Sequence, residues 1–146
     1  MVKVMRKELD EALCAKYPDI FCDRNGDLRT TAMCWGFECG DGWYHIIDAT
    51  CALIQDHFQN QQHNAVWSKH GEGSARVFPP VVATQVKEKY GTLRFYHTGG
   101  DDYIDGVVAM AEYMSGVTCE TCGVPGKLRD DGWLRTLCDE HAKEYE

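Results

Sequence analysis

The sequence contains no long hydrophobic run and no export signal. No stretch approaches the roughly 20 consecutive apolar residues that a membrane helix requires. The N-terminal residues MVKVMRKELDEAL alternate in charge and lack the apolar segment of a secretory signal. We therefore expect a soluble protein that stays in the compartment where it is made.

The signs of a disulfide scaffold are also missing, although the sequence has eight cysteines. A chain of 146 residues can bury about two-thirds of the surface that its unfolded form exposes, so it can fold on its core alone. Three cysteines belong to a metal-ligand pattern described below. We expect the other five, which are irregularly spaced, to be free thiols in a reducing compartment: Cys14, Cys22, Cys34, Cys39 and Cys51.

Basic side chains are scarce, and the shortage is uneven. The chain carries 15 basic and 23 acidic residues, a net charge of −8. Residues 1–98 hold 12 acidic and 11 basic side chains, whereas residues 99–146 hold 11 acidic and 4 basic ones. Such an acidic pole repels nucleic acid and attracts basic protein surfaces, although an acidic excess is also typical of an ordinary soluble surface. As partner-binding residues we predict Asp101, Asp102, Asp130 and Asp131.

Motifs for catalysis are absent too. No Gly-rich phosphate loop follows a predicted strand, and no histidine pairs with an evident nucleophile. Asp101, Asp102 and Asp105 could hold a divalent metal as the carboxylates of nucleases do. Acidic residues in the first turn of a helix also stabilise the helix dipole, and that interpretation is favoured. We therefore predict that the protein is not an enzyme.

Hydrophobic periodicity predicts three helices. The first covers residues 3–16, the second starts at Asp41, and the third is capped by Asp101 or Asp102 and ends at Gly116. The second helix has an apolar stripe at steps of three and four: Trp43, Ile47, Cys51, Ile54 and Phe58. The third has a similar apolar face: Ile104, Val107, Val108, Ala111 and Met114.

Turns and strands fill the intervals between the helices. Trp35 and Phe37 are expected to anchor a glycine-containing region of turns. Residues 59–76 are polar and predict a long exposed loop. Residues 81–98 are rich in strand formers, with Gly91 in the middle. Either a hairpin turns at that glycine, or one long strand carries a bulge there.

The C-terminal residues carry two pairs of metal ligands. Two residues separate Cys119 from Cys122, and Cys138 and His141 repeat this spacing after a gap of fifteen residues. Zinc prefers four tetrahedral thiolate or imidazole ligands, and a redox role for the first pair lacks the βαβ context that it requires. Since protein side chains fill all four positions, we predict one structural Zn²⁺ ion with no open site for catalysis.

The segment between the two ligand pairs has room for a short hairpin, with turn signals at Pro125 and Gly132. A knuckle, a hairpin and a helix that supplies the last two ligands is the layout of treble-clef zinc fingers, which this segment resembles. The predicted fold is therefore α+β. It consists of a small mixed helix and strand domain over residues 1–116 and a treble-clef-like zinc module over residues 117–146, packed on it.

A second metal site is a further possibility, because Cys34 and Cys39 are followed by His45 and Cys51. The last of these belongs to the apolar stripe of the second helix, which favours core thiols. A nuclease of the HNH type also uses a treble clef, but it needs a catalytic histidine that is missing between Ser115 and Leu137.

Nucleic-acid binding is the main functional alternative. The predicted strand region interleaves basic and aromatic side chains, which could stack on and hold a single strand: Lys87, Lys89, Tyr90, Arg94, Phe95 and Tyr96. The same residues are also typical of an ordinary half-buried strand with a solvated basic face.

Three stretches of the sequence resemble a family of small proteins encoded by bacteriophages and prophages: CWGFECGDGWYHIID, VKEKYGTLRFYHTGGDDYIDG and CETCG…TLCDEH. The resemblance covers most of residues 17–142. A zinc-binding protein of this size and acidity is also similar to phage-encoded anti-CRISPR inhibitors of RNA-guided type II nucleases. This resemblance implies a phage-encoded protein in the cytoplasm of the bacterial host that binds a CRISPR nuclease and blocks its engagement of DNA. The alternative is a zinc-stabilised phage accessory protein that binds nucleic acid.

Overall fold

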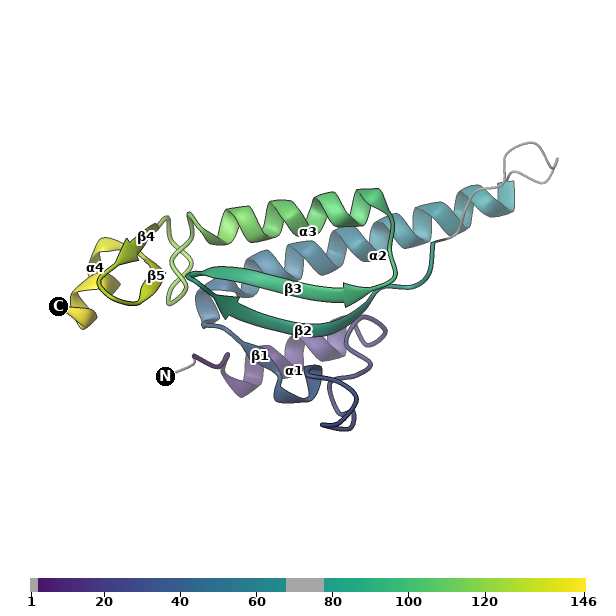
Figure 1. Cartoon of the computed structure of the whole chain (residues 1–146). Helices are drawn as coiled ribbons and strands as arrows, with labels where there is room; N and C mark the ends of the chain where they lie inside the picture. The colour runs from purple at the N-terminus through teal and green to yellow at the C-terminus, as the bar shows by residue number, and fades with distance from the viewer. Residues whose placement is uncertain (1–2, 68–77) are drawn as a thin grey trace.

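The structure is a computed structural model that describes residues 3–67 and 78–146, and it has an α+β fold (Figure 1). The N-terminal part comprises α1 (Lys7–Lys16), η1 (Met33–Trp35), β1 (Phe37–Glu38), η2 (Asp41–Trp43), α2 (Tyr44–Trp67), β2 (Val82–Lys89), β3 (Thr92–Thr98) and α3 (Asp102–Ser115), where η marks a 3₁₀ helix. The C-terminal module, residues 117–146, adds β4 (Lys127–Asp130), β5 (Leu134–Leu137), α4 (Asp139–Ala142) and η3 (Lys143–Tyr145). In Figure 1, α2 runs behind the main sheet, α3 lies above the sheet, and α1 lies below the sheet.

The main sheet has the order β1-β2-β3. Strands β2 and β3 are antiparallel and joined at Tyr90 and Gly91, which both have positive φ angles. Of the two alternatives for residues 81–98, the hairpin is therefore confirmed. Strand β1 pairs in parallel with β2. The first helix begins later than predicted, because Met5 N donates a hydrogen bond to Phe37 O and the chain is still extended beside β1.

Helix α3 covers the open edge of the sheet. The backbone N–H of Leu93 donates to Ser115 Oγ at 2.8 Å, and that of Phe95 donates to Glu112 Oε2 at 3.0 Å. Side chains of α3 thus occupy the donors that the edge strand β3 would otherwise present to solvent or to another chain. The hydrogen bonds fix α3 against the sheet along its C-terminal half.

The apolar stripe predicted for the second helix is buried. Four of its members are at most 2% exposed: Trp43, Ile47, Cys51 and Ile54. The helix extends to Trp67, however, so the prediction of an exposed loop over residues 59–76 was wrong for its first part. The segment QNQQHNAVW has no glycine or proline, and its glutamines and alanine favour helix, so polarity alone did not indicate a loop. Residues 68–76 lie outside the described residues.

The core differs from expectation at two positions. Trp35 is 61% exposed, because the chain turns at Gly36, with a φ of 77°, and brings Phe37 into the core instead. Met114 is 42% exposed, because it lies on the side of α3 that borders a groove with α2. Trp35 was predicted to be an anchor and Met114 to belong to the core-facing side of the third helix, but both are exposed.

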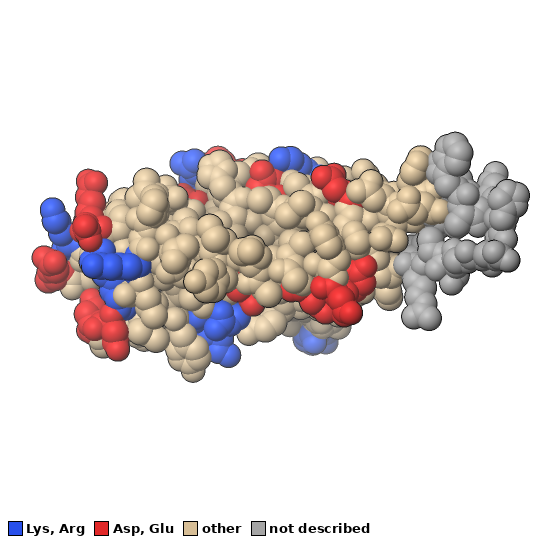
Figure 2. All heavy atoms as spheres, turned by 90° about the horizontal axis from the view of Figure 1, so that it is seen from above, with Lys and Arg blue, Asp and Glu red and all other residues tan. Residues whose placement is uncertain are grey.

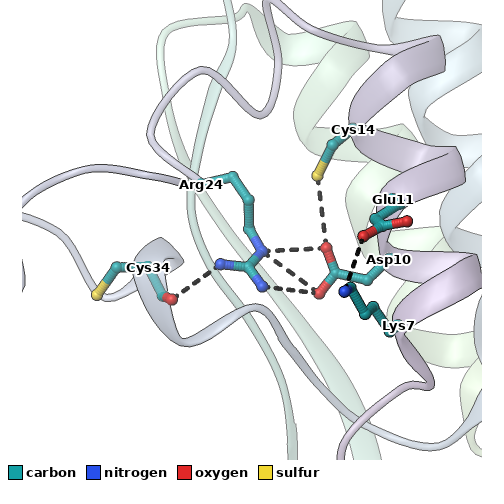
Figure 3. A network of polar contacts seen from close by, with 6 residues as sticks. All are labelled: Lys7, Asp10, Glu11, Cys14, Arg24 and Cys34. Carbon is teal, nitrogen blue, oxygen red and sulfur yellow. Dashed lines mark hydrogen bonds and ion pairs between the residues drawn. The ribbon is translucent and has the colours of Figure 1, made fainter.

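A polar network fixes the segment between α1 and β1 (Figure 3). The guanidinium group of Arg24 donates to both carboxylate oxygens of Asp10, on α1, at 3.0–3.3 Å. It also donates to Cys34 O at 2.9 Å. Burial and then the neighbouring Asp10 carboxylate raise the pKa of Cys14 to about 11, so this thiol stays protonated at neutral pH.

Removing the arginine of this network should destabilise the protein. Arg24→Ala leaves the largely buried Asp10 carboxylate unpaired, and we expect a loss of about 2 kcal/mol in the free energy of unfolding. A fully buried pair would cost about 3–5 kcal/mol, but the Arg24 side chain keeps 28% of its exposure and solvent screens the pair. The control is Arg29→Ala, whose 88% exposed side chain pairs with Asp27. Equal urea midpoints for the two variants would contradict this prediction.

Candidate metal centre

The four predicted zinc ligands come from two local structures. Cys119 and Cys122 lie in a tight turn after α3, which Gly123 closes with a φ of 82° and a hydrogen bond from its N–H to Cys119 O. After the β4–β5 hairpin, Cys138 forms the N-cap of α4, and His141 lies within this helix. The turn, the hairpin and the helix follow one another in the predicted order.

These four side chains converge on one point. Their ligand atoms all lie within 4.8 Å of one another. Cys138 Sγ is 3.2 Å from His141 Nδ1, Cys119 Sγ is 3.7 Å from the same nitrogen, and Cys122 Sγ is 3.9 Å from Cys138 Sγ. Tetrahedral zinc, with bonds of about 2.3 Å to sulfur and 2.0 Å to nitrogen, separates its ligand atoms by about 3.5–3.8 Å. The cluster can therefore hold one metal ion, and its donors and spacing are consistent with zinc.

The surroundings of the cluster favour an anionic sulfur at its most buried position. Burial opposes ionisation of Cys119, but backbone N–H groups of Cys138, Cys122 and Thr121 outweigh it and lower the pKa of Cys119 to about 6. For Cys122 the Val124 N–H acts in the same direction, but burial and the neighbouring sulfur atoms raise the pKa. Neighbouring thiolates repel one another, and a divalent cation between them removes that repulsion.

A buried glutamate that the sequence did not indicate joins the cluster to the start of α2. Glu120, between the first two cysteines, accepts hydrogen bonds from Gly40 N through Oε2 and from Gly42 N through its backbone oxygen, both at 2.8 Å. Burial raises the pKa of Glu120. A Cβ atom at position 42 would lie 2.1 Å from Cys119 O and 2.6 Å from Gly123 N. The two glycines of the stretch CGDGW thus allow the metal-binding turn to approach the backbone closely.

The close approach at Gly42 gives a testable contrast with another glycine. Gly42→Ala should destabilise the protein by about 1–3 kcal/mol, because backbone atoms must shift to accept the methyl group. At Gly106, in α3, the new Cβ of Gly106→Ala would meet no described atom within 4 Å beyond the helix's own neighbouring backbone, so this change should be neutral or stabilising by up to about 1 kcal/mol. Thermal unfolding of both variants checks this. A loss of stability for Gly42→Ala that is no larger than that for Gly106→Ala would contradict the close approach of Gly42 to the metal-binding turn.

Two further hydrogen bonds attach the C-terminal module to the rest of the protein. Trp43 Nε1 donates to Thr118 O at 2.9 Å. The buried Thr136 Oγ1 donates to Gly91 O, in the turn of the main hairpin, at 2.7 Å. The module therefore contacts both the start of α2 and the β2–β3 turn, at the left end of the molecule in Figure 1.

The second metal site is not formed. Within residues 3–67 and 78–146, the cluster around Cys119 is the only convergent group of at least three potential ligands. Cys39 is fully buried, and burial raises its pKa well above the usual value. Cys34 donates to Thr31 O at 3.1 Å. Cys39 thus belongs to the core and Cys34 to the 3₁₀ helix η1.

The four predicted partner-binding aspartates do not form one patch. Asp101 and Asp102 lie at the start of α3, whereas Asp130 and Asp131 lie at the end of β4 and in the turn after it, beyond the other end of α3. The fourteen residues of α3 separate the two pairs by about 20 Å. Asp131 also pairs with Arg135 at 3.1 Å. The acidic excess of residues 99–146 is therefore spread along the molecule.

Asp101 has a structural role that makes a pH-dependent prediction. Its side chain accepts from Ile104 N at 3.1 Å and lies 2.8 Å from His57 Nε2. Desolvation opposes ionisation, but these hydrogen bonds outweigh it and lower the pKa of Asp101 below 3.8. A lowered folded-state pKa gives stability that is present above the unfolded-state value and is lost as the pH falls through the folded one. Asp101→Asn, which keeps the N-cap acceptor, should thus be less stable than the original protein at pH 6, and the difference should disappear only as the pH falls below the folded-state pKa of Asp101, which lies under 3.8. The same difference in urea midpoint between the two proteins at high and at low pH would contradict this prediction.

Comparison with protein-family models, curated proteins and solved structures gives no match to this chain. The resemblance to phage proteins and to anti-CRISPR inhibitors therefore stays a prediction. Among the residues that the structure describes, no helix combines the length and the apolar character needed to cross a bilayer.

Proposed function

We propose that this chain is a protein-binding inhibitor of a host defence nuclease, with one Zn²⁺ ion in a structural role. The proposed ion is held by Cys119, Cys122, Cys138 and His141. Four protein ligands leave no coordination position for water or substrate, so the ion stabilises the C-terminal module and supplies no chemistry. The function then depends on the surface of the protein.

The observation that carries this proposal is an exposed apolar face on α2 and α3. Its large side chains are 42–74% exposed: Leu53, Tyr103, Met110, Tyr113 and Met114. Figure 2 shows this side of the molecule, where uncharged residues cover most of the surface and charged ones lie mainly toward its margins. Contiguous exposed apolar surface of this kind is typical of sites that bind other proteins.

The net charge supports a basic protein as the target. At −8 the chain is repelled by nucleic acid and attracted to basic surfaces. RNA-guided type II nucleases present a positively charged channel to their heteroduplex. The resemblance to anti-CRISPR inhibitors therefore names a target class that the charge also favours.

A pull-down from bacterial lysate, with and without nuclease treatment of the lysate, tests the proposal. We expect the zinc-loaded chain to retain an RNA-guided nuclease after treatment and to release it as salt rises. Loss of all bound protein on treatment would contradict the proposal and favour binding through nucleic acid.

One observation favours the second candidate function, binding of single-stranded nucleic acid. The register pairs Lys87 with Arg94 and Gln85 with Tyr96, so these side chains share one face of the hairpin. Together with residues 30–32, this face lines a shallow pocket of about 460 Å³. Phe95, which was included in the predicted stacking set, is only 2% exposed and belongs to the core. If this candidate is right, Lys87→Glu should weaken binding to single-stranded DNA, and the salt dependence of binding should decrease.

A further inference from the structure

We propose that the groove between α2 and α3 binds one amphipathic helix of a partner protein, with Lys and Arg residues flanking the helix's apolar stripe. This inference rests on the proposed function as a protein-binding module and names the surface and the chemistry of the partner. The groove has a volume of about 630 Å³.

The groove is lined by both small and large apolar residues. The small ones include Ala49, on α2, and Gly106, on α3. Leu53, Met110 and Met114 line it and are 42–62% exposed. Methionine side chains are flexible and polarisable, and they adapt to the apolar side chains of a partner. A groove between two helices accommodates the side chains of a third helix packed along it.

The charge of the two helices selects a basic partner. Neither α2 nor α3 contains a lysine or an arginine. Both contain acidic residues, although Asp48 pairs with Lys16 and Glu112 accepts a hydrogen bond from Phe95 N of the sheet, which leaves Asp56, Asp102 and Asp105. Asp102 lines the groove itself at one end. A helix with basic flanks therefore gains a favourable interaction at the Asp102 end of the groove and meets no lysine or arginine of α2 or α3, whereas an acidic helix is repelled at that end.

The same charge argues against a second copy of this chain as the occupant. In a twofold dimer the same surface of both copies meets at the interface. Two groove faces without any lysine or arginine would then bring like charges together, which costs free energy on association. A partner of opposite charge does not have this cost.

The presence of a glycine inside α3, Gly106, independently supports the binding of a partner helix in the groove. A glycine inside a helix is unfavourable relative to alanine, and a reason for its presence is usually close packing. Apart from the neighbouring backbone of α3 itself, no described atom lies within 4 Å of the position that a Cβ would take. The space above Gly106 opens into the groove, where a partner helix can approach the backbone of α3 closely.

Two synthetic helical peptides of about 18 residues, or five turns, test the inference. Both carry leucines at i, i+3, i+4 and i+7 spacing. One has lysines beside the apolar stripe, and the other has glutamates. Fluorescence anisotropy with the zinc-loaded full chain should show saturable binding of the lysine peptide and at least about tenfold weaker binding of the glutamate peptide.

Variants of the chain locate the binding site. Gly106→Gln places a long side chain in the groove without breaking the helix, and Met110→Lys adds a repulsive charge. Each should raise the dissociation constant of the lysine peptide by about tenfold or more. Trp133→Gln is the matched control, because this aromatic residue is 57% exposed in the β4–β5 turn and lies outside the groove. Circular dichroism and zinc content establish that each variant is folded.

Three outcomes would overturn the inference. The first is equal binding of the two peptides, and the second is unchanged binding in both groove variants. The third is a dimer in sedimentation experiments that Met110→Lys dissociates, because a second copy would then occupy the groove. The pull-down from bacterial lysate described above distinguishes a failure of this inference from a failure of the proposed function. If the groove variants still retain the nuclease, the inference fails and the proposed function stands. If the original chain retains no protein, the proposed function fails, whatever the peptides show.

Discussion

Replacing Cys119 by serine is expected to release the metal ion and unfold the C-terminal module. Cys119 is fully buried, and its sulfur lies 3.7 Å from His141 Nδ1. The module has few buried apolar side chains of its own, Leu137 among them. Structural zinc contributes about 10–16 kcal/mol of apparent binding free energy in small zinc domains, so its loss should leave residues 117–146 without a stable fold.

Elemental analysis and hydrogen exchange check this result. The original protein should carry about one zinc ion per chain, and Cys119→Ser should carry none. Amide protection should be lost within the module. Cys22→Ser is the control, since this exposed thiol donates a hydrogen bond to its neighbour Asp23, is not one of the four clustered ligands, and should keep both zinc and protection. A folded Cys119→Ser variant with full zinc content would show that the cluster is not the binding site.

Trp43→Ala is expected to produce the largest loss of stability among the core positions. Trp43 is the largest fully buried side chain among those that the structure describes, and its indole N–H donates to Thr118 O at 2.9 Å. The substitution removes the contacts of the ring, leaves a cavity and breaks a bond to the C-terminal module. We expect a decrease of about 3–5 kcal/mol in the free energy of unfolding.

Two comparisons separate these contributions. Trp43→Phe keeps much of the apolar volume but leaves the Thr118 carbonyl without its donor, and it should cost about 1–3 kcal/mol. Trp133→Ala removes an equally large side chain that is 57% exposed and should cost less than about 1 kcal/mol. Urea unfolding gives all three values. Similar costs at positions 43 and 133 would contradict the placement of Trp43 in the core.

The metal ligands could be predicted from the sequence because their geometry is local. Each pair of ligands comes from one turn or one helical start, and the spacing of two residues within each pair reports that directly. The stripe of α2 was predictable for a similar reason, because burial of one helix face follows a fixed period. In both cases the residues that form the pattern are close together in the sequence.

Long-range contacts gave no such signal. Gly40 N bonds to Glu120 across 80 positions of the chain, and nothing in the pattern around either residue indicates the other. The close packing of glycines against the metal-binding turn was therefore missed. The end of α2 was missed because polar residues suit an exposed helix as well as a loop. The single acidic pole was wrong because counting charges along the chain ignores the length of α3 between them.

Titration of a purified RNA-guided type II nuclease with the zinc-loaded chain tests the central claim most directly. DNA cleavage is measured at fixed guide RNA and target DNA while the amount of chain increases. Binding of the chain to the same DNA without nuclease is measured in parallel. The proposed function predicts that cleavage stops near equimolar chain and nuclease and that the chain alone does not bind the DNA. Undiminished cleavage at excess chain, together with direct DNA binding that Lys87→Glu weakens, would contradict it.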